Sequence, residues 1–203
     1  MIPAQPTNSG FRPARVISGG QTGVDRAALD VAIELGMAHG GWCPRGRLAE
    51  DAPIPAQYRL SETDSPDYAV RTERNVLDGD ATLILCRGRP GGGTELTERL
   101  AERHGKPHLV VDLERSPDPD DAARWLQTCR PVVLNVAGPR ESQSRGIAAQ
   151  AAGFLRRLFQ APMNEDPQSL IPNPSPPAVP RRTAGACRST PDRAGRCGPV
   201  REG

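Results

Sequence analysis

The chain has 203 residues, a length typical of one domain or of one domain with a tail, and its formal net charge is only +2. A balance this close to neutral argues against a nucleic-acid-binding protein, because such domains usually carry a strong basic excess. No apolar stretch approaches the roughly 20 residues needed to cross a bilayer, so no membrane association is expected. Five cysteines, an odd number without a CxxC pair, favour a reduced, cytoplasmic setting.

Short apolar segments alternate with helical patterns along the chain. In order, we predict a strand at 15–18, a helix at 25–35, a long loop with one short strand near Tyr58 at 42–65, a helix at 67–77, a strand at 81–86, a helix at 94–104, a strand at 108–113, a helix at 118–129, a strand at 131–137 and a helix at 146–159. Such alternation implies a parallel sheet, because right-handed crossovers place the helices on its faces. The sequence therefore predicts an α/β fold with a mostly parallel sheet.

The composition changes sharply near Ala161. Seven prolines fall between Pro162 and Pro180, and few of the residues that follow could fill a core. We therefore predict a flexible N-terminus over residues 1–14, one ligand-binding domain over 15–160 and a Pro-rich disordered tail over 161–203. The N-terminal segment has no apolar core, so a signal peptide is not expected.

Three glycine-bearing loops follow predicted strands, and ligands of open parallel sheets bind at the carboxyl ends of the strands. The first loop, 18–26, contains Gly19, Gly20 and Gly23 in a GGxxG spacing that matches neither GxGxxG nor a Walker loop. Glycines let backbone amides approach an anion, and the following helix directs its free amides and positive dipole end to the same place. The alternative is a tight strand–helix turn that binds nothing.

The second loop, 87–95, places Gly91, Gly92 and Gly93 directly before Thr94. Three consecutive glycines are costly in chain entropy, which favours an anion cradle over a plain connection. Thr94 either donates its hydroxyl to a phosphate or caps its helix.

The third loop, 135–142, contains Asn135 and Arg140. Asn135 either orients a ligand or satisfies backbone groups of the loop. The planar guanidinium of Arg140 suits a phosphate, and the alternative is a solvated charge. The adjacent carboxylates Glu50 and Asp51 allow a catalytic or magnesium role, although solvated charge is the favoured interpretation.

No metal or catalytic group is assigned from spacing. His39, His104 and His108 lack the spacing of metal ligands, so no protein-ligated metal is predicted. No nucleophile–base arrangement is evident either, and the catalytic residues stay unknown.

Several segments, in the same order along the chain, resemble the family of putative molybdenum cofactor carriers. They are 17–26, 41–47, 50–51, Tyr68, 71–76, 79–84, 91–94 and 134–140. The resemblance covers about residues 15–159. It implies a Rossmann-like, three-layer fold of the group that includes the lysine decarboxylase-like phosphoribohydrolases and the DNA-processing protein A domain.

What the resemblance implies is a carrier that binds molybdenum cofactor (molybdopterin), with the phosphate on the amides of 19–23 and 91–94. The residues expected to bind the ligand or its phosphate are Gly19, Gly20, Gln21, Thr22, Gly23, Asn75, Gly91, Gly92, Gly93, Thr94, Asn135 and Arg140. The molybdenum needs no side chain, since the dithiolene of the cofactor holds it. The resemblance also implies a homo-oligomer, with molybdoenzymes or cofactor-synthesis proteins as partners.

The second loop departs from the PGGxGTxxE motif of the phosphoribohydrolases. In the corresponding stretch, 90–97, one residue is missing before the last glycine, and Thr97 stands where the catalytic glutamate would be. Glu98 lies about 100° further around the helix, which argues against glycosidic hydrolysis. Two alternatives to a carrier are a nucleotide-processing hydrolase, with Glu95, Glu98 or Asp25 as acid or base, and a nucleotide sensor whose tail contacts a partner.

Overall fold

The computed structural model describes residues 11–160, so the predictions made for residues 1–10 and for the tail, 161–203, lie outside the described residues. Within 11–160, five parallel strands form the main sheet in the order β2-β1-β7-β5-β6. They are β1 (Arg15–Ile17), β2 (Ala38–Gly40), β5 (Ala81–Cys86), β6 (His108–Asp112) and β7 (Val133–Ala137). β7 is the central strand: Leu134 is in register with Val16 of β1 on one side and with Ala81 of β5 on the other.

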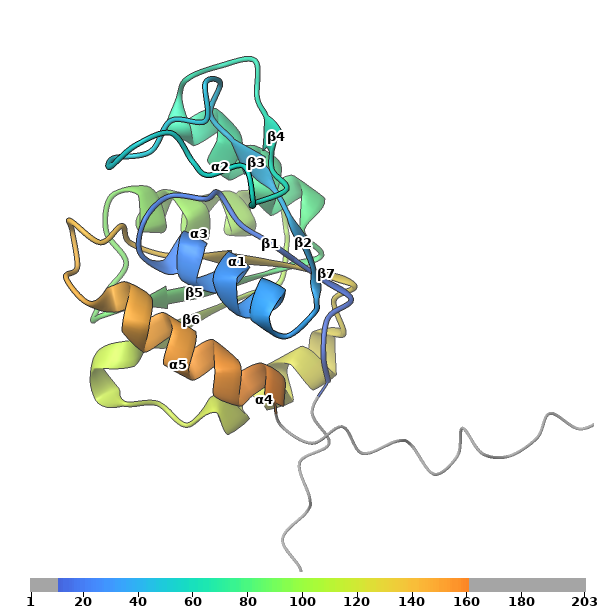
Figure 1. Ribbon diagram of the computed structural model, residues 1–203. Coiled ribbons are helices and arrows are strands. Elements are labelled where there is room, and N and C mark those ends of the chain that lie inside the picture. Colours follow the sequence, from blue (N-terminus) through green and yellow to red (C-terminus); the bar gives the residue numbers. More distant parts are fainter. Residues whose placement is uncertain (1–10, 161–203) are drawn as a thin grey trace, which may run out of the picture. The chain divides into compact units, whose positions relative to one another are not determined.

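Helices cover both faces of this sheet. They are α1 (Val24–Glu34), α2 (Tyr68–Asp78), α3 (Gly93–Arg103), α4 (Pro119–Cys129) and α5 (Ile147–Gln160), with a short 3-10 helix, η1 (Leu113–Arg115), after β6. The crossovers β1–α1–β2 and β5–α3–β6 run in opposite directions across the sheet, so their right-handedness places α1 and α3 on opposite faces. Figure 1 shows α2 and α3 above the strands and α4 and α5 below them. The Rossmann-like, three-layer α/β prediction is therefore confirmed.

The larger part of the core lies between the sheet and the layer of α1, α4 and α5. Phe154, Leu155 and Leu158 of α5 follow helical spacing and are at most 2% exposed. All six residues of β5 are buried, as expected for a parallel strand that is covered on both faces. A smaller cluster of Val76 with Leu100 and Ala101 joins α2 to α3 on the other face.

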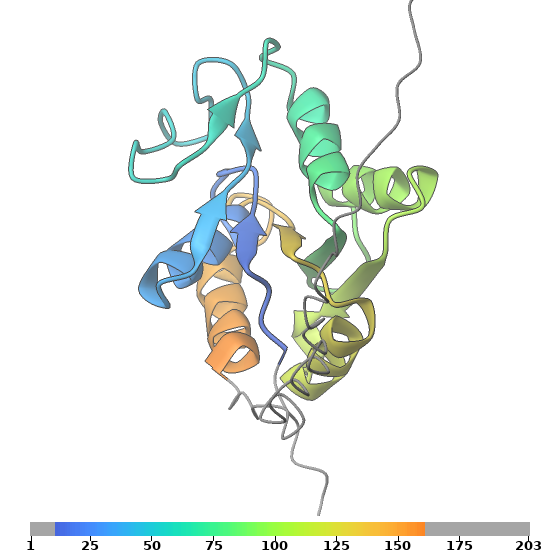
Figure 2. The same cartoon turned by 90° about the vertical axis from the view of Figure 1, so that its right-hand side faces the viewer.

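A second, two-stranded parallel sheet pairs β3 (Trp42–Cys43) with β4 (Ser61–Glu62). The strand predicted near Tyr58 thus lies three residues later, and Tyr58 is instead a buried side chain that donates a hydrogen bond to Asp30 Oδ1 at 2.8 Å. The strands β2 and β3 had no counterpart in the prediction. In Figure 2 the arrows of β1 and β2 point toward the end of the domain that carries β3 and β4. The small sheet therefore extends the domain beyond the carboxyl edge of the main sheet.

The helix that follows the second glycine loop begins earlier than predicted. Gly92 is the N-cap of α3, with φ 55°, and Thr94 is the second residue inside the helix. Thr94 is therefore not the cap, which leaves its hydroxyl free for another partner. By contrast, the side chains of Asp67 and Asp118 cap α2 and α4 by accepting hydrogen bonds from backbone amides.

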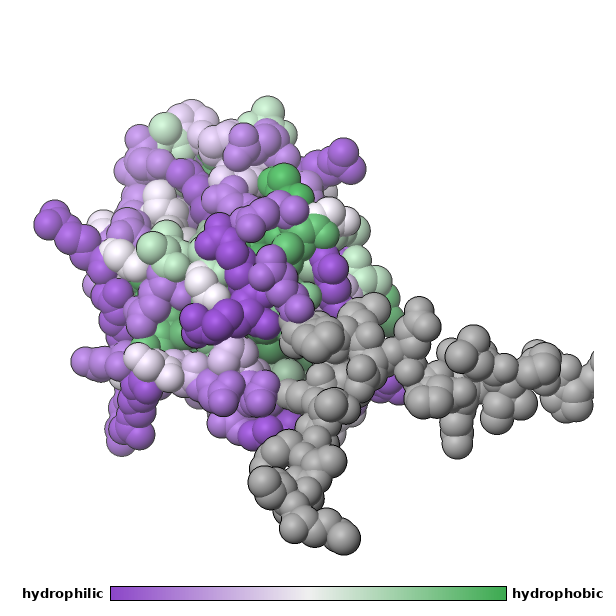
Figure 3. Space-filling model, turned by 60° about the horizontal axis from the view of Figure 1, so that its bottom comes forward, coloured by the Kyte–Doolittle hydropathy of each residue, from purple (hydrophilic) through white to green (hydrophobic). Residues whose placement is uncertain are grey.

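The face drawn in Figure 3 is mainly hydrophilic, with hydrophobic residues in small, separate patches. No helix in the described part of the chain has the length and apolar composition that a membrane span requires.

Candidate functional site

The carboxyl edge of the sheet contains a topological switch point between β5 and β7. The chain leaves β5 toward α3 on one face, and it leaves β7 toward α5 on the other face. The second loop, 87–92, and the third loop, 138–146, therefore diverge and open a crevice above these two strands. Ligands of doubly wound sheets bind at such a point.

Two adjacent cavities occupy this crevice. The inner cavity, about 90 Å³, is lined by Gln21, Asp25, Tyr68, Ala69, Arg71, Thr72, Gly93, Thr94, Leu96, Thr97, Ala137, Gly138, Arg140 and Gln143. The outer cavity, about 500 Å³, is lined by Cys86, Arg87, Arg89, Gly91, Thr94, Pro139, Gln143 and Ser144. Thr94 and Gln143 border both cavities, and the outer one has the volume of a small-molecule site. The fold thus brings parts of all three predicted loops together.

The second glycine loop is open. Gly91, Gly92 and Gly93 are exposed, and a Cβ atom at Gly91 or Gly93 would meet nothing within 4 Å. No described residue accepts a hydrogen bond from the backbone amides of Gly92 and Gly93. These amides lie at the positive end of α3, where an anion is stabilised. The loop therefore has the geometry of an anion cradle.

Arginines surround the cavities. Arg71 and Arg140 line the inner cavity, and Arg87 and Arg89 line the outer one. Arg87 is held in place by Gln150 Oε1 at 2.9 Å and by the backbone oxygen of Arg145 at 2.8 Å. Arg89 forms no ion pair with any described residue. The crevice therefore favours a ligand with negative charge.

The first glycine loop is closely covered by other parts of the chain. A Cβ at Gly19 would lie 1.6 Å from Arg71 Nη1, and one at Gly20 would lie 2.5 Å from Leu60 Cδ1. These two glycines are therefore needed for packing. The amides of Gln21 and Thr22 already donate to Asp25 Oδ2 and to Gln21 Oε1.

The amides of Gly19 and Gly20 find no acceptor among residues 11–160, although both glycines are buried. The groups of the first loop that have no partner in the described chain include these two amides and the amide nitrogen of the Gln21 side chain, and of these three residues only Gln21 borders the inner cavity. Thr22 borders a different hollow, between α1 and α5.

A buried ion pair lies at the back of the inner cavity. Arg71 Nη1 is 3.0 Å from Asp25 Oδ2, and the side chain of Asp25 is 3% exposed. Burial raises the pKa of Asp25, and the positive charge and hydrogen bond of Arg71 act against this increase. The Nε of Arg71 is buried without a hydrogen-bond partner among the described residues. The pair therefore places the Arg71 guanidinium, with one hydrogen-bond donor left unpaired, beside the inner cavity.

Glu50 ties the first loop to the third. Its carboxylate accepts hydrogen bonds from the hydroxyl groups of Thr22 and Ser142, and from the Ser142 amide at 3.2 Å. Desolvation raises the pKa of Glu50, but these hydrogen bonds together outweigh it, so the pKa lies below its usual value. Arg140 Nε lies 3.8 Å from the same carboxylate. Glu50 and Asp51 are thus engaged in holding loops, since Asp51 pairs with Arg26 at 2.6 Å.

Seven of the twelve predicted ligand residues border neither cavity: Gly19, Gly20, Thr22, Gly23, Asn75, Gly92 and Asn135. Asn75 is 2% exposed, and its side chain bonds both the amide and the carbonyl of Trp42, so it fixes β3 to α2. Asn135 lies in the middle of β7 and donates to Thr82 Oγ1 at 3.3 Å. Both side chains are occupied by neighbours within the protein.

Sequence reasoning had given no role to Arg71, Arg87, Arg89 and Gln143, which border the cavities. Arg87 and Arg89 lie in the second loop itself, just before its three glycines, and that position was the available signal. Cys86 also borders the outer cavity, but burial raises its pKa to about 11, so at neutral pH it is a thiol and a weak metal ligand.

The doubly wound order of the sheet, with glycine loops at its switch point, defines a Rossmann-like α/β protein. The family model described as "Circularly permutated YpsA SLOG family" matches residues 16–159, and the chain belongs to this family. A crystal structure described as a putative molybdenum carrier protein, from Syntrophus aciditrophicus SB, is 44% identical to this chain, with a TM-score of 0.71. The match covers 75% of this chain and 98% of that one. The comparison with curated proteins gives no match. The resemblance to molybdenum carriers noted in the sequence is thus confirmed.

Proposed function

We propose that this protein binds and carries molybdenum cofactor, or a closely related phosphate-bearing pterin, at the β5–β7 switch point. The observation that carries the proposal is the open second glycine loop. Its Gly92 and Gly93 amides have no acceptor in the described chain, and Gly91 and Gly93 border cavities that arginines also line. The 44% identity to a protein described as a putative molybdenum carrier supports the choice of ligand.

In this proposal the phosphate lies on the amides of Gly92 and Gly93 at the start of α3. Arg140 of the inner cavity and Arg89 of the outer cavity bind it as well, because guanidinium groups form strong bidentate hydrogen bonds with phosphate. The Thr94 hydroxyl, which no described residue bonds, donates the next hydrogen bond. The organic part of the ligand occupies the outer cavity, and the Gln21 side chain at the inner cavity forms a second contact.

The proposed carrier acts by binding and shielding, and its residues need no reaction step. The molybdenum atom stays on the dithiolene of the cofactor. The described residues that border the cavities offer no thiolate for it, since Cys86 is protonated at neutral pH. The protein would contribute a charged cradle and exclude water from one side of the ligand.

The direct test is to purify the protein from a molybdenum-replete host and to identify the retained ligand by mass spectrometry, with molybdenum measured on the same sample. We expect molybdopterin and molybdenum in constant ratio to protein. In calorimetric titrations with isolated molybdopterin, Arg140→Gln should weaken binding at least tenfold, or about 1.4 kcal/mol. The matched control is Arg124→Gln, which removes an exposed arginine of α4. Equal affinity of wild type and Arg140→Gln would contradict the proposed site.

A hydrolase remains the second candidate, because Asp25 borders the inner cavity and burial raises its pKa. The other two candidate acids, Glu95 and Glu98, border neither cavity. Thr97, which stands where the catalytic glutamate of the phosphoribohydrolases would be, donates its hydroxyl to the Gly93 carbonyl at 3.0 Å. Incubation with AMP and N6-modified AMP, with assay of free base, separates the two functions. Turnover of roughly 1 per second or more would make the hydrolase the better assignment.

A further inference from the structure

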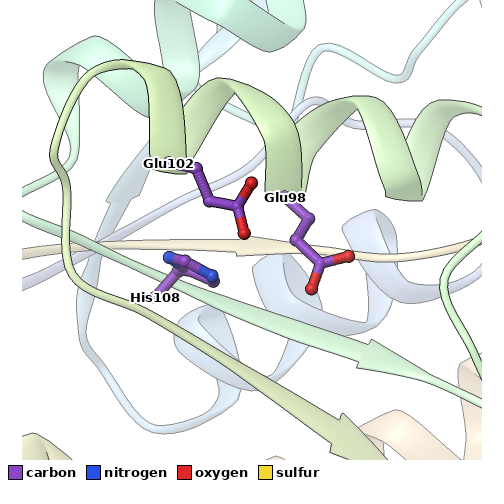
Figure 4. A group of neighbouring side chains, drawn as sticks. All are labelled: Glu98, Glu102 and His108. Carbon is purple, nitrogen blue, oxygen red and sulfur yellow. The ribbon is translucent and has the colours of Figure 1, made fainter.

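A cluster of potential metal ligands lies on α3 and β6, outside the candidate ligand site. Glu98 and Glu102 are one helical turn apart on α3, and His108 is the first residue of β6. Figure 4 shows both side chains extending from α3 on the side of the helix where His108 lies. One ligand atom from each of the three residues lies within 4.8 Å of the other two. The crossover between α3 and β6 therefore brings together three ligands whose sequence spacing gave no indication of a site.

The two carboxylates have no counter-ion among the described residues. No hydrogen bond or ion pair joins the side chain of Glu98 or Glu102 to another residue in 11–160. Carboxylates at i and i+4 on a helix repel each other. In the same region the other close histidine–glutamate pair, His104 and Glu73, is satisfied as a simple pair at 2.8 Å. A divalent cation would neutralise both free carboxylates at once.

The imidazole of His108 is oriented by a contact of its own. Its Nδ1 lies 3.4 Å from the backbone oxygen of Lys106. When Nδ1 carries the proton and donates it to this carbonyl, Nε2 keeps the lone pair that a metal requires. A hydrogen bond from the second ring nitrogen to a carbonyl is the usual support of a metal-binding histidine. The contact with Lys106 is compatible with this tautomer, and the three-residue cluster itself carries the inference.

We propose that Glu98, Glu102 and His108 bind one divalent first-row transition ion, of which Zn²⁺ is the best probe. One imidazole with two carboxylates suits Zn²⁺, Mn²⁺ or Fe²⁺, whereas Mg²⁺ and Ca²⁺ take oxygen ligands. Ligand atoms about 2.1 Å from a tetrahedral zinc ion are about 3.4 Å apart. The three ligand atoms lie within 4.8 Å of one another, and small side-chain rotations bring them to this shorter separation. The remaining coordination position belongs to water, which reaches the site because Glu102 is exposed.

The ion joins the C-terminal half of α3 to the beginning of β6. The N-terminus of the same helix forms part of the second glycine loop. Metal binding therefore stabilises the helix that carries the proposed phosphate cradle. The metal site itself involves no residue of either cavity, and it does not depend on the identity of the ligand bound there.

The test is calorimetric titration of the chelator-treated full chain with Zn²⁺, Mn²⁺ and Mg²⁺. We expect one Zn²⁺ per chain, weaker Mn²⁺ binding, no measurable Mg²⁺ binding, and a higher thermal midpoint with Zn²⁺. Glu98→Gln and His108→Gln should each lower the Zn²⁺ affinity at least tenfold. Glu95→Gln is the matched control, because Glu95 is an exposed glutamate on the same helix without a histidine beside it. Circular dichroism verifies that the variants fold.

Zinc binding with equal affinity in the wild type and in a Glu98→Gln, His108→Gln double variant would overturn the proposal, because other histidines or cysteines would then be the ligands. Absence of saturable binding would overturn it as well. Neither result affects the proposed carrier function, which is measured by the retained pterin and its molybdenum.

Discussion

Asp25 and Arg71 are a buried pair whose members depend on each other. Asp25 accepts from Arg71 and from the Gln21 amide, and Arg71 has an unpartnered Nε. Removal of one member leaves the other as an uncompensated charge in a poorly solvated place, which costs more than the pair contributes. The pair also lies against Gly19, so it fixes the shape of the first loop.

We predict that Asp25→Asn lowers the free energy of unfolding by about 3 kcal/mol, because the Arg71 guanidinium loses its counter-charge. Arg71→Met should also destabilise the protein, because the buried Asp25 carboxylate then loses its counter-charge. The double variant should be more stable than the sum of the two losses allows. Urea denaturation of the four proteins measures the coupling. Strictly additive losses would show that the two side chains act independently, despite the 3.0 Å contact.

A second prediction concerns the pH dependence of stability. The Arg26 guanidinium donates two hydrogen bonds to Asp51 and holds the pKa of that carboxyl below its ordinary value of 3.8. The resulting stability is fully present above about pH 4, and it disappears as the pH falls through the lower, folded-state pKa. Asp51→Asn should therefore destabilise the protein at pH 7 by at most about 1 kcal/mol, since the pair is partly exposed. Thermal melts from pH 7 to pH 2 should show the wild type and the variant converging in acid, and a constant difference would contradict the assignment.

At the level of elements, the start of α3 allows a direct comparison between ligand contact and backbone strain. Gly92 has φ 55°, so any side chain there is strained whether or not a ligand binds. Gly93 has no positive φ, and a Cβ added to it meets nothing within 4 Å. A side chain added at Gly93 therefore occupies space in front of the helix without straining the backbone or displacing a neighbour.

We predict that Gly93→Val weakens the binding of a phosphate-bearing ligand at least tenfold, or about 1.4 kcal/mol. The thermal midpoint should change little, because the added side chain extends into open space. Gly153→Ala in α5 is the control, since its Cβ is also unobstructed and Gly153 borders neither cavity. Titration with molybdopterin and with AMP reports binding. A valine variant that folds and binds like the wild type would exclude the α3 N-terminus as the phosphate site.

The elements that the sequence predicted are those with a strong local pattern. β5 is a six-residue apolar run, and α5 repeats apolar residues at helical spacing, so both could be predicted almost to their ends. β2 and β3 have three and two residues, and their pairing partners come from distant parts of the chain. No local pattern specifies such strands. β2 forms by joining the edge of the main sheet beside β1, and β3 forms by pairing with β4 in the small sheet.

The same contrast holds for the candidate site. The glycine loops could be found because glycines before a helix are visible in the sequence. The role of Asn75 could not be anticipated, because its side chain is occupied by the backbone of Trp42, a residue of a strand that the sequence did not predict. Arg71 was missed for a related reason, since only the packing of α2 against the first loop brings it beside Asp25.

For the whole molecule, the order of the strands is informative. When counting starts at β5, the sheet order β2-β1-β7-β5-β6 becomes 5-4-3-1-2, which is the common doubly wound order 2-1-3-4-5 read from the other edge. The matching family is described as circularly permutated, in agreement with this numbering. In both Figure 1 and Figure 2 the start of the described chain and the end of α5 lie at the same end of the domain. The fold therefore has a natural alternative starting point, between β4 and α2.

We predict that a permutant that begins at Pro66 and ends at Ser65 keeps the fold, when residue 160 is joined to residue 11 by a flexible linker. Pro66 is exposed and has no backbone amide to lose, and the Asp67 cap of α2 is retained. A linker of about ten glycine and serine residues spans up to about 33 Å. The reference is the linear fragment 11–160, and we expect a loss of at most about 2 kcal/mol, or roughly 4–8 °C in thermal midpoint. A second permutant, opened between Leu83 and Ile84 inside β5, should not fold, because that cut interrupts a strand with neighbours on both sides. If the Pro66 permutant also fails to unfold cooperatively, the present order of the chain is itself required for folding.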